Sequence, residues 1–184
     1  GIALYNTNLL SIDTNQVKGA GTQDDSQYYI TSVGPDSEVY VDMPTLPADG
    51  QNVNIHTRLA SPGVEAATDG YRYLYSHETG VDLEGIARWD NTTATALGDT
   101  MMTDFSAGDS LGGDIIGSTL QLYRKNGGSW ASLGTRTDAT YTAAGYLALA
   151  CTNNVPRMAN FSGGTGVTAS VSPSASASAS VSPS

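Results

Sequence analysis

The sequence has few of the residues that carry redox, metal or thiol chemistry. Its 184 residues include one cysteine, Cys151, so an internal disulfide is excluded. We expect this thiol to be a small buried hydrophobe, and an intermolecular disulfide is the alternative. The two histidines, His56 and His77, are too few to suggest a zinc site or thiol catalysis.

Basic residues are also scarce, because 8 Lys and Arg stand against 18 Asp and Glu, for a net charge of -10. A phosphate backbone would repel this chain, so we expect no nucleic-acid partner. No long apolar run or polybasic cluster is present, so we expect no membrane insertion. The chain begins at Gly1 and stops within a repeat, so we expect either a fragment of a longer protein or the removal of a leader.

Short alternating segments separated by Gly, Pro, Asn and Asp occupy residues 25–166. Their connections are too short for helical crossovers, so they predict one all-β domain, an antiparallel two-sheet sandwich. Residues 62–70 are the best helical candidate and are barely two turns long. The expected strands are 27–33, 37–43, 52–59, 70–77, 80–90, 100–105, 109–116, 118–128, 129–137, 145–152 and 157–163.

Alternation along each strand assigns its two faces, and we take the leucine-bearing faces as core. In 118–124 this rule places Leu120 and Leu122 inside, with Gln121 and Tyr123 outside. In 81–89 it places three side chains inside: Leu83, Ala87 and Trp89. The opposite face of that segment carries Asp82, Glu84 and Arg88, which we expect to be solvated surface groups.

The two ends of the chain differ from this domain. Residues 1–24 are expected to be a linker or a first strand. Residues 167–184 form a low-complexity Ser/Ala/Pro tail, with serine at every even position from 170 to 184. The tail lacks aromatic and charged residues, so it cannot bury enough apolar surface to offset its chain entropy. We expect an extended, solvated spacer or stalk; ordering against a neighbour or silk-like pairing are the alternatives.

Two stretches carry a resemblance to a known family: "GDTMMTDFSAGDSLGGDIIGSTLQLYRKNGG" from residue 98 and "GYLALACTNNVPRMANFSGG" from residue 145. They resemble the concanavalin A-like lectin/glucanase superfamily, in particular the laminin-G-like jelly rolls of phage and bacterial surface proteins. The resemblance implies a jelly-roll sandwich with the extended tail attached, in which one exposed sheet face or the rim loops bind sugar. It also implies a non-enzymatic structural or adhesion domain at an extracellular or virion surface.

The partners expected from this resemblance are surface glycans or neighbouring structural subunits, including a homo-oligomer. A secreted lectin module is the alternative, and a glucanase-like glycosidase is a further one. Glucanases of the superfamily carry Glu-x-Asp-x-Glu on a central strand, and "GVDLE" matches this frame except that Gly80 stands at the nucleophile position. We therefore expect no enzyme, although Asp82 and Glu84 remain in the frame.

The glycan-binding candidates come from polar and aromatic faces. In 52–59, alternation places Val53, Ile55, Thr57 and Leu59 on one face and His56 and Arg58 on the polar face, where we expect a surface pair rather than a site. Tyr71, Tyr73 and Tyr75 alternate, so they could stack on sugar, contact another subunit or pack in the core. Core packing is favoured, because the face with Arg72 and Ser76 is too polar for an interior. The complete candidate set is His56, Arg58, Tyr71, Tyr73, Tyr75, Asp82, Glu84 and Arg88.

A cofactor is not expected, and calcium is the one alternative because loop carboxylates suit a hard cation. The candidate ligands have no specific spacing: Asp24, Asp25, Asp99, Asp104, Asp109 and Asp114. Acidic loops in a chain of this charge need no metal to explain them.

Overall fold

The structure is a computed structural model, and it describes residues 10–20, 24–28, 32–61, 69–91 and 93–166, with the backbone alone for 24–28. The tail and residues 62–68 of the 62–70 helical candidate lie outside these ranges, and the last residue of that candidate, Gly70, begins a strand. The described ranges contain thirteen strands and no helix: β1 (Leu10–Asp13), β2 (Gln16–Gly19), β3 (Asp24–Tyr28), β4 (Ser37–Thr45), β5 (Gln51–Leu59), β6 (Gly70–His77), β7 (Leu83–Asp90), β8 (Thr93–Ala96), β9 (Ser110–Ile116), β10 (Thr119–Asn126), β11 (Ser129–Thr137), β12 (Tyr146–Thr152) and β13 (Arg157–Thr165).

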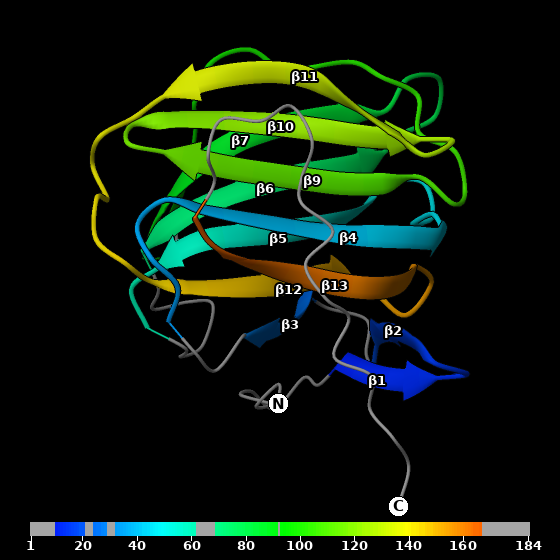
Figure 1. Cartoon of the computed structure of the whole chain (residues 1–184). Helices are drawn as coiled ribbons and strands as arrows, with labels where there is room; N and C mark the ends of the chain where they lie inside the picture. The colour runs from blue at the N-terminus through cyan, green and yellow to red at the C-terminus, as the bar shows by residue number, and fades with distance from the viewer. Residues whose placement is uncertain (1–9, 21–23, 29–31, 62–68, 92, 167–184) are drawn as a thin grey trace, which may run out of the picture.

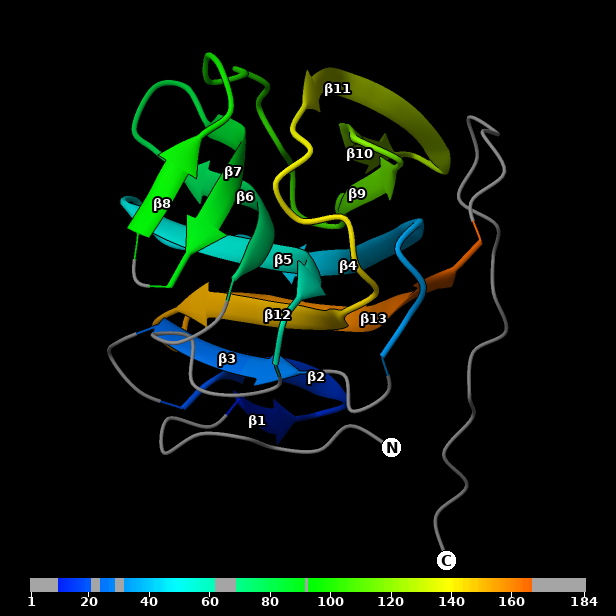
Figure 2. The same cartoon turned by 90° about the vertical axis from the view of Figure 1, so that its left-hand side faces the viewer.

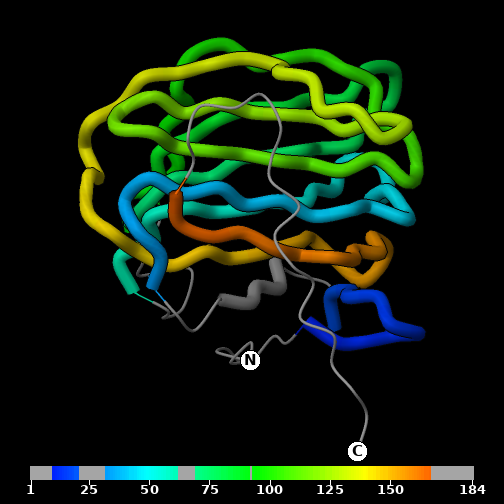
Figure 3. Tube along the Cα trace, viewed as in Figure 1, coloured from blue at the N-terminus to red at the C-terminus, as the bar shows by residue number. Residues whose placement is uncertain are grey.

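The strands form two antiparallel sheets that pack face to face, as Figures 1 and 2 show. The seven-stranded sheet has the order β1-β2-β13-β4-β9-β10-β11, and the six-stranded sheet has the order β3-β12-β5-β6-β7-β8. Consecutive strands lie in different sheets at six points: β2/β3, β3/β4, β4/β5, β8/β9, β11/β12 and β12/β13 (Figure 3). This arrangement confirms the predicted all-β, two-sheet sandwich.

The core lies between the two sheets and contains the side chains that alternation placed there. Leu120, Leu122 and Cys151 are fully buried, as expected. The rings of Tyr71, Tyr73 and Tyr75 fill the interior at 0% exposure, which confirms the favoured interpretation of that stripe. Each phenol reaches a hydrogen-bond acceptor at the edge of the core: an Asp138 carboxylate, the Asp114 carbonyl and an Asp82 carboxylate, respectively.

The prediction for β7 was wrong, because its core face is the one without leucine. The register of β6 against β7 pairs Tyr75 with Glu84 and Tyr73 with Ile86. Directly paired residues lie on the same face of a sheet, so Glu84 and Ile86 enter the core with the tyrosines. Leu83 is therefore turned outward, where it is half-buried. The isoleucine, not the leucine, marks the buried face of this strand.

Residues 100–105 do not form the expected strand. Met101 makes a single antiparallel bridge to Glu84, and the chain then runs irregularly to β9. Phe105 packs under Tyr75, with a centroid distance of 4.5 Å, and its amide donates to Asp82 at 2.9 Å. This segment, residues 101–109, closes one end of the sandwich.

Candidate functional site: the outer face of the seven-stranded sheet

The outer face of the seven-stranded sheet carries polar and aromatic side chains where its inner face is aliphatic. On β4 the side chains of Val39, Val41 and Met43 are fully buried, and Tyr40 and Asp42 between them point outward and are half-buried. The registers of β4 with β9 and of β9 with β10 align the outward residues in rows across the sheet. These rows place residues that are distant in sequence side by side.

The middle row holds an aromatic cluster. Tyr40, Gly112 and Tyr123 are aligned across β4, β9 and β10. Trp130 of β11 lies over Gly112, where a Cβ atom would come within 2.7 Å of the indole ring. The indole centroid is 6.1 Å from that of Tyr40 and 6.4 Å from that of Tyr123, both edge-on. We call Tyr40, Tyr123 and Trp130 the aromatic cluster; glycine at 112 lets the indole lie on the sheet.

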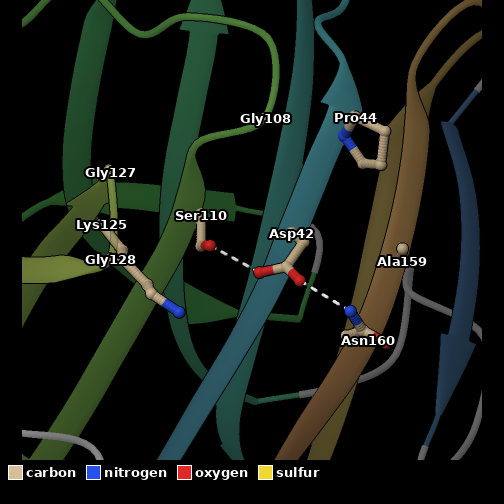
Figure 4. Close-up of a pocket in the computed structure, with 9 residues that line it drawn as sticks. All are labelled: Asp42, Pro44, Gly108, Ser110, Lys125, Gly127, Gly128, Ala159 and Asn160. Atoms are coloured by element: carbon tan, nitrogen blue, oxygen red, sulfur yellow. Dashed lines mark hydrogen bonds between the residues drawn. The ribbon is translucent and has the colours of Figure 1, made fainter.

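The next row forms one side of an open pocket with a volume of about 360 Å³. Asp42, Ser110 and Lys125 are aligned across β4, β9 and β10. Figure 4 shows the Asp42 carboxylate between two donors, the Ser110 hydroxyl and the Asn160 amide; the latter is at 2.8 Å. The pocket is completed by Pro44, Gly108, Gly127, Gly128 and Ala159. A fixed carboxylate and an ammonium group beside glycine walls can bind hydroxyl groups without steric obstruction.

Lys125 connects the pocket to the aromatic cluster. It lines the pocket, and its Nζ atom lies 5.8 Å from the centroid of the Trp130 ring. That distance is within the range of a cation–π interaction. The pocket and the cluster therefore form one continuous surface, with hydrogen-bonding groups at one end and the half-buried rings of Tyr40 and Trp130 at the other. Tyr123 is buried, at 7% exposure.

The third row is acidic. Glu38 and Asp114 are directly paired across β4 and β9, and the Tyr123 hydroxyl donates to Asp114 at 2.8 Å. Burial raises the pKa of both carboxyls, and the Asp114 charge raises the pKa of Glu38 further. The row gives the face a negative potential that disfavours anionic ligands.

The sequence-predicted site residues lie elsewhere. The rings of Tyr71, Tyr73 and Tyr75 are enclosed between the sheets and offer no face on which a sugar could stack. His56 is 4% exposed, and burial, together with the Arg72 charge, lowers its pKa to about 3. It is therefore neutral, which differs from the expected surface group.

Arg58 is also buried, at 3% exposure, and its guanidinium holds three loops together. It donates to the carbonyls of Pro35, Gly117 and Tyr141 at 2.6, 2.7 and 2.7 Å. The Asp36 carboxylate lies 3.6 Å from Nη2. These contacts engage all three guanidinium nitrogens internally, so the buried group is not presented to a ligand on the surface.

Asp82, Glu84 and Arg88 do not form the expected solvated surface group. Asp82 is 4% exposed and accepts hydrogen bonds from Tyr75, His77 and the Phe105 amide. Glu84 is 0% exposed in the core. Arg88 instead pairs with Asp90 at 2.8 Å and with Asp138 at 3.0 Å. A polysaccharide has no access to the two acids in this arrangement, which leaves them unsuited to the glycosidase frame.

The calcium candidates are dispersed as well. Asp109 is paired with Arg124 at 2.6 Å, and Asp114 accepts from Tyr123. The side chains of Asp24 and Asp25 lie outside the described part of the structure. Within that part, no group of three or more His, Cys, Asp or Glu residues is arranged to hold a metal ion. The calcium candidates among the described residues therefore do not form a metal site.

Sequence reasoning missed most of the surface that the fold assembles, although part of the signal was visible. Gln121 and Tyr123 were correctly placed on the outer face of their strand. The alternation of Glu38, Tyr40 and Asp42 with three aliphatic residues carried the same signal. Nothing local indicated that Trp130 crosses over Gly112, since that contact depends on the pairing of three strands.

Comparisons with known proteins identify the fold. No protein-family model and no curated protein sequence match the chain. Among solved structures, it is similar to carbohydrate-binding module CBM66 from Bacillus subtilis, with a TM-score of 0.69 and 14% identity over 89% of this chain and 95% of that one. It is also similar to a legume lectin-like domain from Entamoeba histolytica, with a TM-score of 0.65 and 10% identity over 87% and 88% of the two chains.

A third similar structure is the exoplasmic/lumenal domain of VIP36 in its Ca²⁺- and mannose-bound form, with a TM-score of 0.62 and 10% identity over 82% of this chain and 80% of that one. All three are concanavalin A-like jelly-roll sandwiches, and this chain has that fold. The described residues also include no helix with the length and hydropathy needed to cross a bilayer.

Proposed function

We propose that this chain is a non-catalytic carbohydrate-binding module, and that the outer face of its seven-stranded sheet binds a glycan. The observation that carries the proposal is the aromatic cluster beside the Asp42 pocket. Sugars combine apolar C–H faces with hydroxyl groups, so a stacking surface next to fixed polar groups matches their chemistry. The names of the similar structures, a carbohydrate-binding module, a legume lectin-like domain and a domain in its mannose-bound form, support the same function.

The charge of this face indicates the class of glycan. Glu38, Asp42 and Asp114 outnumber the single cation Lys125 among the residues of the three rows, and the chain has a net charge of -10. Long-range repulsion slows the approach of polyanions. The ligand class that fits is an uncharged, hydroxyl-rich glycan, and sulfated or uronic-acid polymers do not fit.

The test is a glycan-array screen followed by calorimetry with the best neutral oligosaccharide. Trp130→Ala should weaken binding at least 30-fold, because an aromatic anchor at the centre of a contact contributes about 2 kcal/mol or more. Trp89→Ala is the matched control: Trp89 lies on β7 of the other sheet, where Arg72 stacks on it, and it should change affinity by less than about threefold. Equal losses for both tryptophans, or binding to sulfated glycans alone, would contradict the proposal.

For the setting of the module, we propose an extracellular or virion surface, where residues 167–184 act as a spacer for an adhesion or coating domain. The support is the composition of the tail, which is rich in Ser, Ala and Pro and has no charge. A structural subunit of a fibre or filament is the competing function, and it predicts ordered self-association in the absence of any glycan. Light scattering during size-exclusion chromatography separates the two functions.

The spacer proposal makes a prediction about stability. Deletion of residues 169–184 should leave the melting temperature of the domain nearly unchanged, because so little apolar area cannot offset the backbone entropy of ordering the tail. Differential scanning calorimetry of the full and shortened chains measures this. A decrease of more than about 5 °C would show that the tail docks on the domain with roughly a kcal/mol or more.

A further inference from the structure

Glu84 is a buried acid that the proposed glycan site does not use. Its side chain is fully enclosed between the sheets, and neither carboxylate oxygen makes a hydrogen bond of normal geometry with a described residue, the Thr103 amide being the one backbone donor that acts on it. An unpaired carboxylate is costly to bury in its charged form, so the environment favours the neutral acid. Burial and the nearby Asp82 charge raise the pKa of Glu84 to about 8.

The groups that act on Glu84 come from its own part of the chain and from three other parts of the fold. Tyr75 of β6 is its cross-strand partner, and Asp82 precedes it on the chain. Asp104 from the 101–109 segment adds a further negative charge, and the Thr103 amide and Arg124 of β10 favour the ionised form. Arg124 is thus the one cation among these groups, and it belongs to the strand opposite β7.

Arg124 is already engaged by a different acid. Its guanidinium binds Asp109 at 2.6 Å through Nη2, and it lies over the Phe105 ring at 5.1 Å. The same Asp109 oxygen accepts from the Ser106 amide at 2.8 Å, which closes the turn at residues 106–109. The turn is also attached to β4, since the Gly108 amide donates to the Met43 carbonyl at 2.8 Å.

This turn is part of the glycan pocket. Gly108 lines it, and the next strand begins with Ser110, which donates to Asp42. The backbone of Glu84 exchanges two hydrogen bonds with Met101 at the start of the same segment. Residues 101–109 therefore run from the buried acid to the pocket wall. Arg124 interacts with both ends of this segment: it binds Asp109 at the pocket end, and its positive charge favours the ionised form of Glu84 at the other.

We propose that the protonation state of Glu84 regulates the glycan pocket: the neutral acid leaves Arg124 on Asp109, whereas ionised Glu84 draws Arg124 inward and releases the turn that carries Gly108. The binding part of this inference rests on the proposed function. The pocket is ordered at neutral pH and loosens at alkaline pH. The proton lost from Glu84 goes to solvent.

The direction of the pH effect follows from the difference in the pKa of Glu84 between the folded and the unfolded chain. The pKa of Glu84 is raised to about 8 in the folded protein, above a value of about 4.3 for an unfolded chain. Below about pH 3 both states hold the proton and the group makes no difference to stability. Between about pH 4.3 and 8 the folded state holds more protons, so its stability falls as the pH rises. The loosening is therefore expected above about pH 8, where folded Glu84 ionises.

Amide hydrogen exchange at Gly108 and Asp109 tests the switch without any ligand. Exchange measured by NMR from pH 6.5 to 9, corrected for the intrinsic rate, should show protection falling at least tenfold in the wild type. In Glu84→Gln, which is neutral at every pH, the fall should be less than threefold. Asp99→Asn removes an exposed carboxyl and should behave as the wild type. Parallel falls in wild type and Glu84→Gln, or constant protection in the wild type, would overturn the proposal.

Two further measurements keep the test decisive. If Glu84→Gln does not fold, the Arg124 Nε–H and Gly108 amide resonances of the wild type should shift with one common midpoint near pH 8. Different midpoints, or no shift, would reject the coupling.

Calorimetry with the best-binding neutral oligosaccharide should show affinity at least tenfold weaker at pH 9 than at pH 6.5 in the wild type, and a change below threefold in Glu84→Gln. Equal pH dependence in both proteins would reject regulation. If no glycan binds, the proposed function fails while the exchange result still decides whether the switch exists.

Discussion

Replacing Arg58 with methionine is expected to destabilise the domain by about 3–5 kcal/mol, which would lower the melting temperature by roughly 10–15 °C. The reason is the number of groups that lose a partner at once. Arg58 is the buried donor to three loop carbonyls, from Pro35, Gly117 and Tyr141. Methionine has similar length and can fill the volume, but it leaves each carbonyl without a donor, at about 1–3 kcal/mol for each buried group.

Two variants show whether the geometry or the charge is responsible. Arg58→Lys keeps the charge but cannot direct planar donors at three separated carbonyls, so it should recover only part of the loss. Arg157→Met is the matched control, because Arg157 also donates to several carbonyls, all within its own half-exposed loop. It should cost less than about 1 kcal/mol. Thermal denaturation of the three variants measures these differences. A decrease below about 3 °C for Arg58→Met would refute the role of the guanidinium as the link between loops.

Arg58 also illustrates what the sequence could not supply. Alternation along β5 correctly placed Val53 and Ile55 in the core between the sheets, and it therefore placed the intervening polar residues outside. Leu59 is buried as well, but in a separate cluster with Ala148. That inference assumes that the polar face of a strand is exposed to solvent. The arginine instead lies beneath loops that start far away along the chain, and their convergence is a property of the topology. No local pattern around residue 58 indicates it.

The two-sheet fold could be predicted because its signal is repeated in almost every strand. The period of two, the turn residues and the tyrosine stripe all require a sheet with one buried face. The error at β7 shows the limit of this reasoning. The face of this strand that enters the core carries a mixture of polar and apolar residues, so alternation alone does not identify it as the buried face. The pairing with β6 determines it, because Glu84 lies opposite Tyr75 and enters the core with it. A buried acid without a partner violates the general preference, so pattern reasoning was bound to place it outside.

The candidate site was harder still, because its parts come from separate strands. Tyr40, Tyr123 and Trp130 come from three strands and meet through three antiparallel registers, one of which has a bulge between Leu122 and Tyr123. One residue of slippage would turn Tyr123 into the core. The sequence therefore identifies which residues face outward, but the registers decide which of them become neighbours.

Replacing either of two adjacent glycines on β9 with alanine is expected to affect a different property: glycan binding at Gly112 and stability at Gly113. Gly112 faces outward under Trp130, and Gly113 faces inward under Tyr73. A methyl group at 112 would meet one side chain at the surface, which can move aside at the expense of the aromatic cluster. Gly112→Ala should therefore reduce glycan binding at least tenfold and change the free energy of unfolding by less than about 1 kcal/mol.

Gly113→Ala should destabilise the domain by about 3 kcal/mol, because the new methyl group would clash with a buried ring that cannot move. A Cβ atom at this position would lie 2.5, 2.6 and 2.7 Å from three atoms of the Tyr73 ring. The ring cannot move away, since it is fully buried and its hydroxyl donates to the Asp114 carbonyl at 2.5 Å.

Urea denaturation gives the free energies of unfolding. Gly85→Ala on β7 serves as the control, because a Cβ there has no atom within 4 Å, and this change should be neutral or slightly stabilising. Combining Gly113→Ala with Tyr73→Leu should cost less than the sum of the two single changes, since the smaller side chain makes room for the methyl group. Strict additivity, or equal stability of the Gly113 and Gly85 variants, would show that the ring does not press against β9.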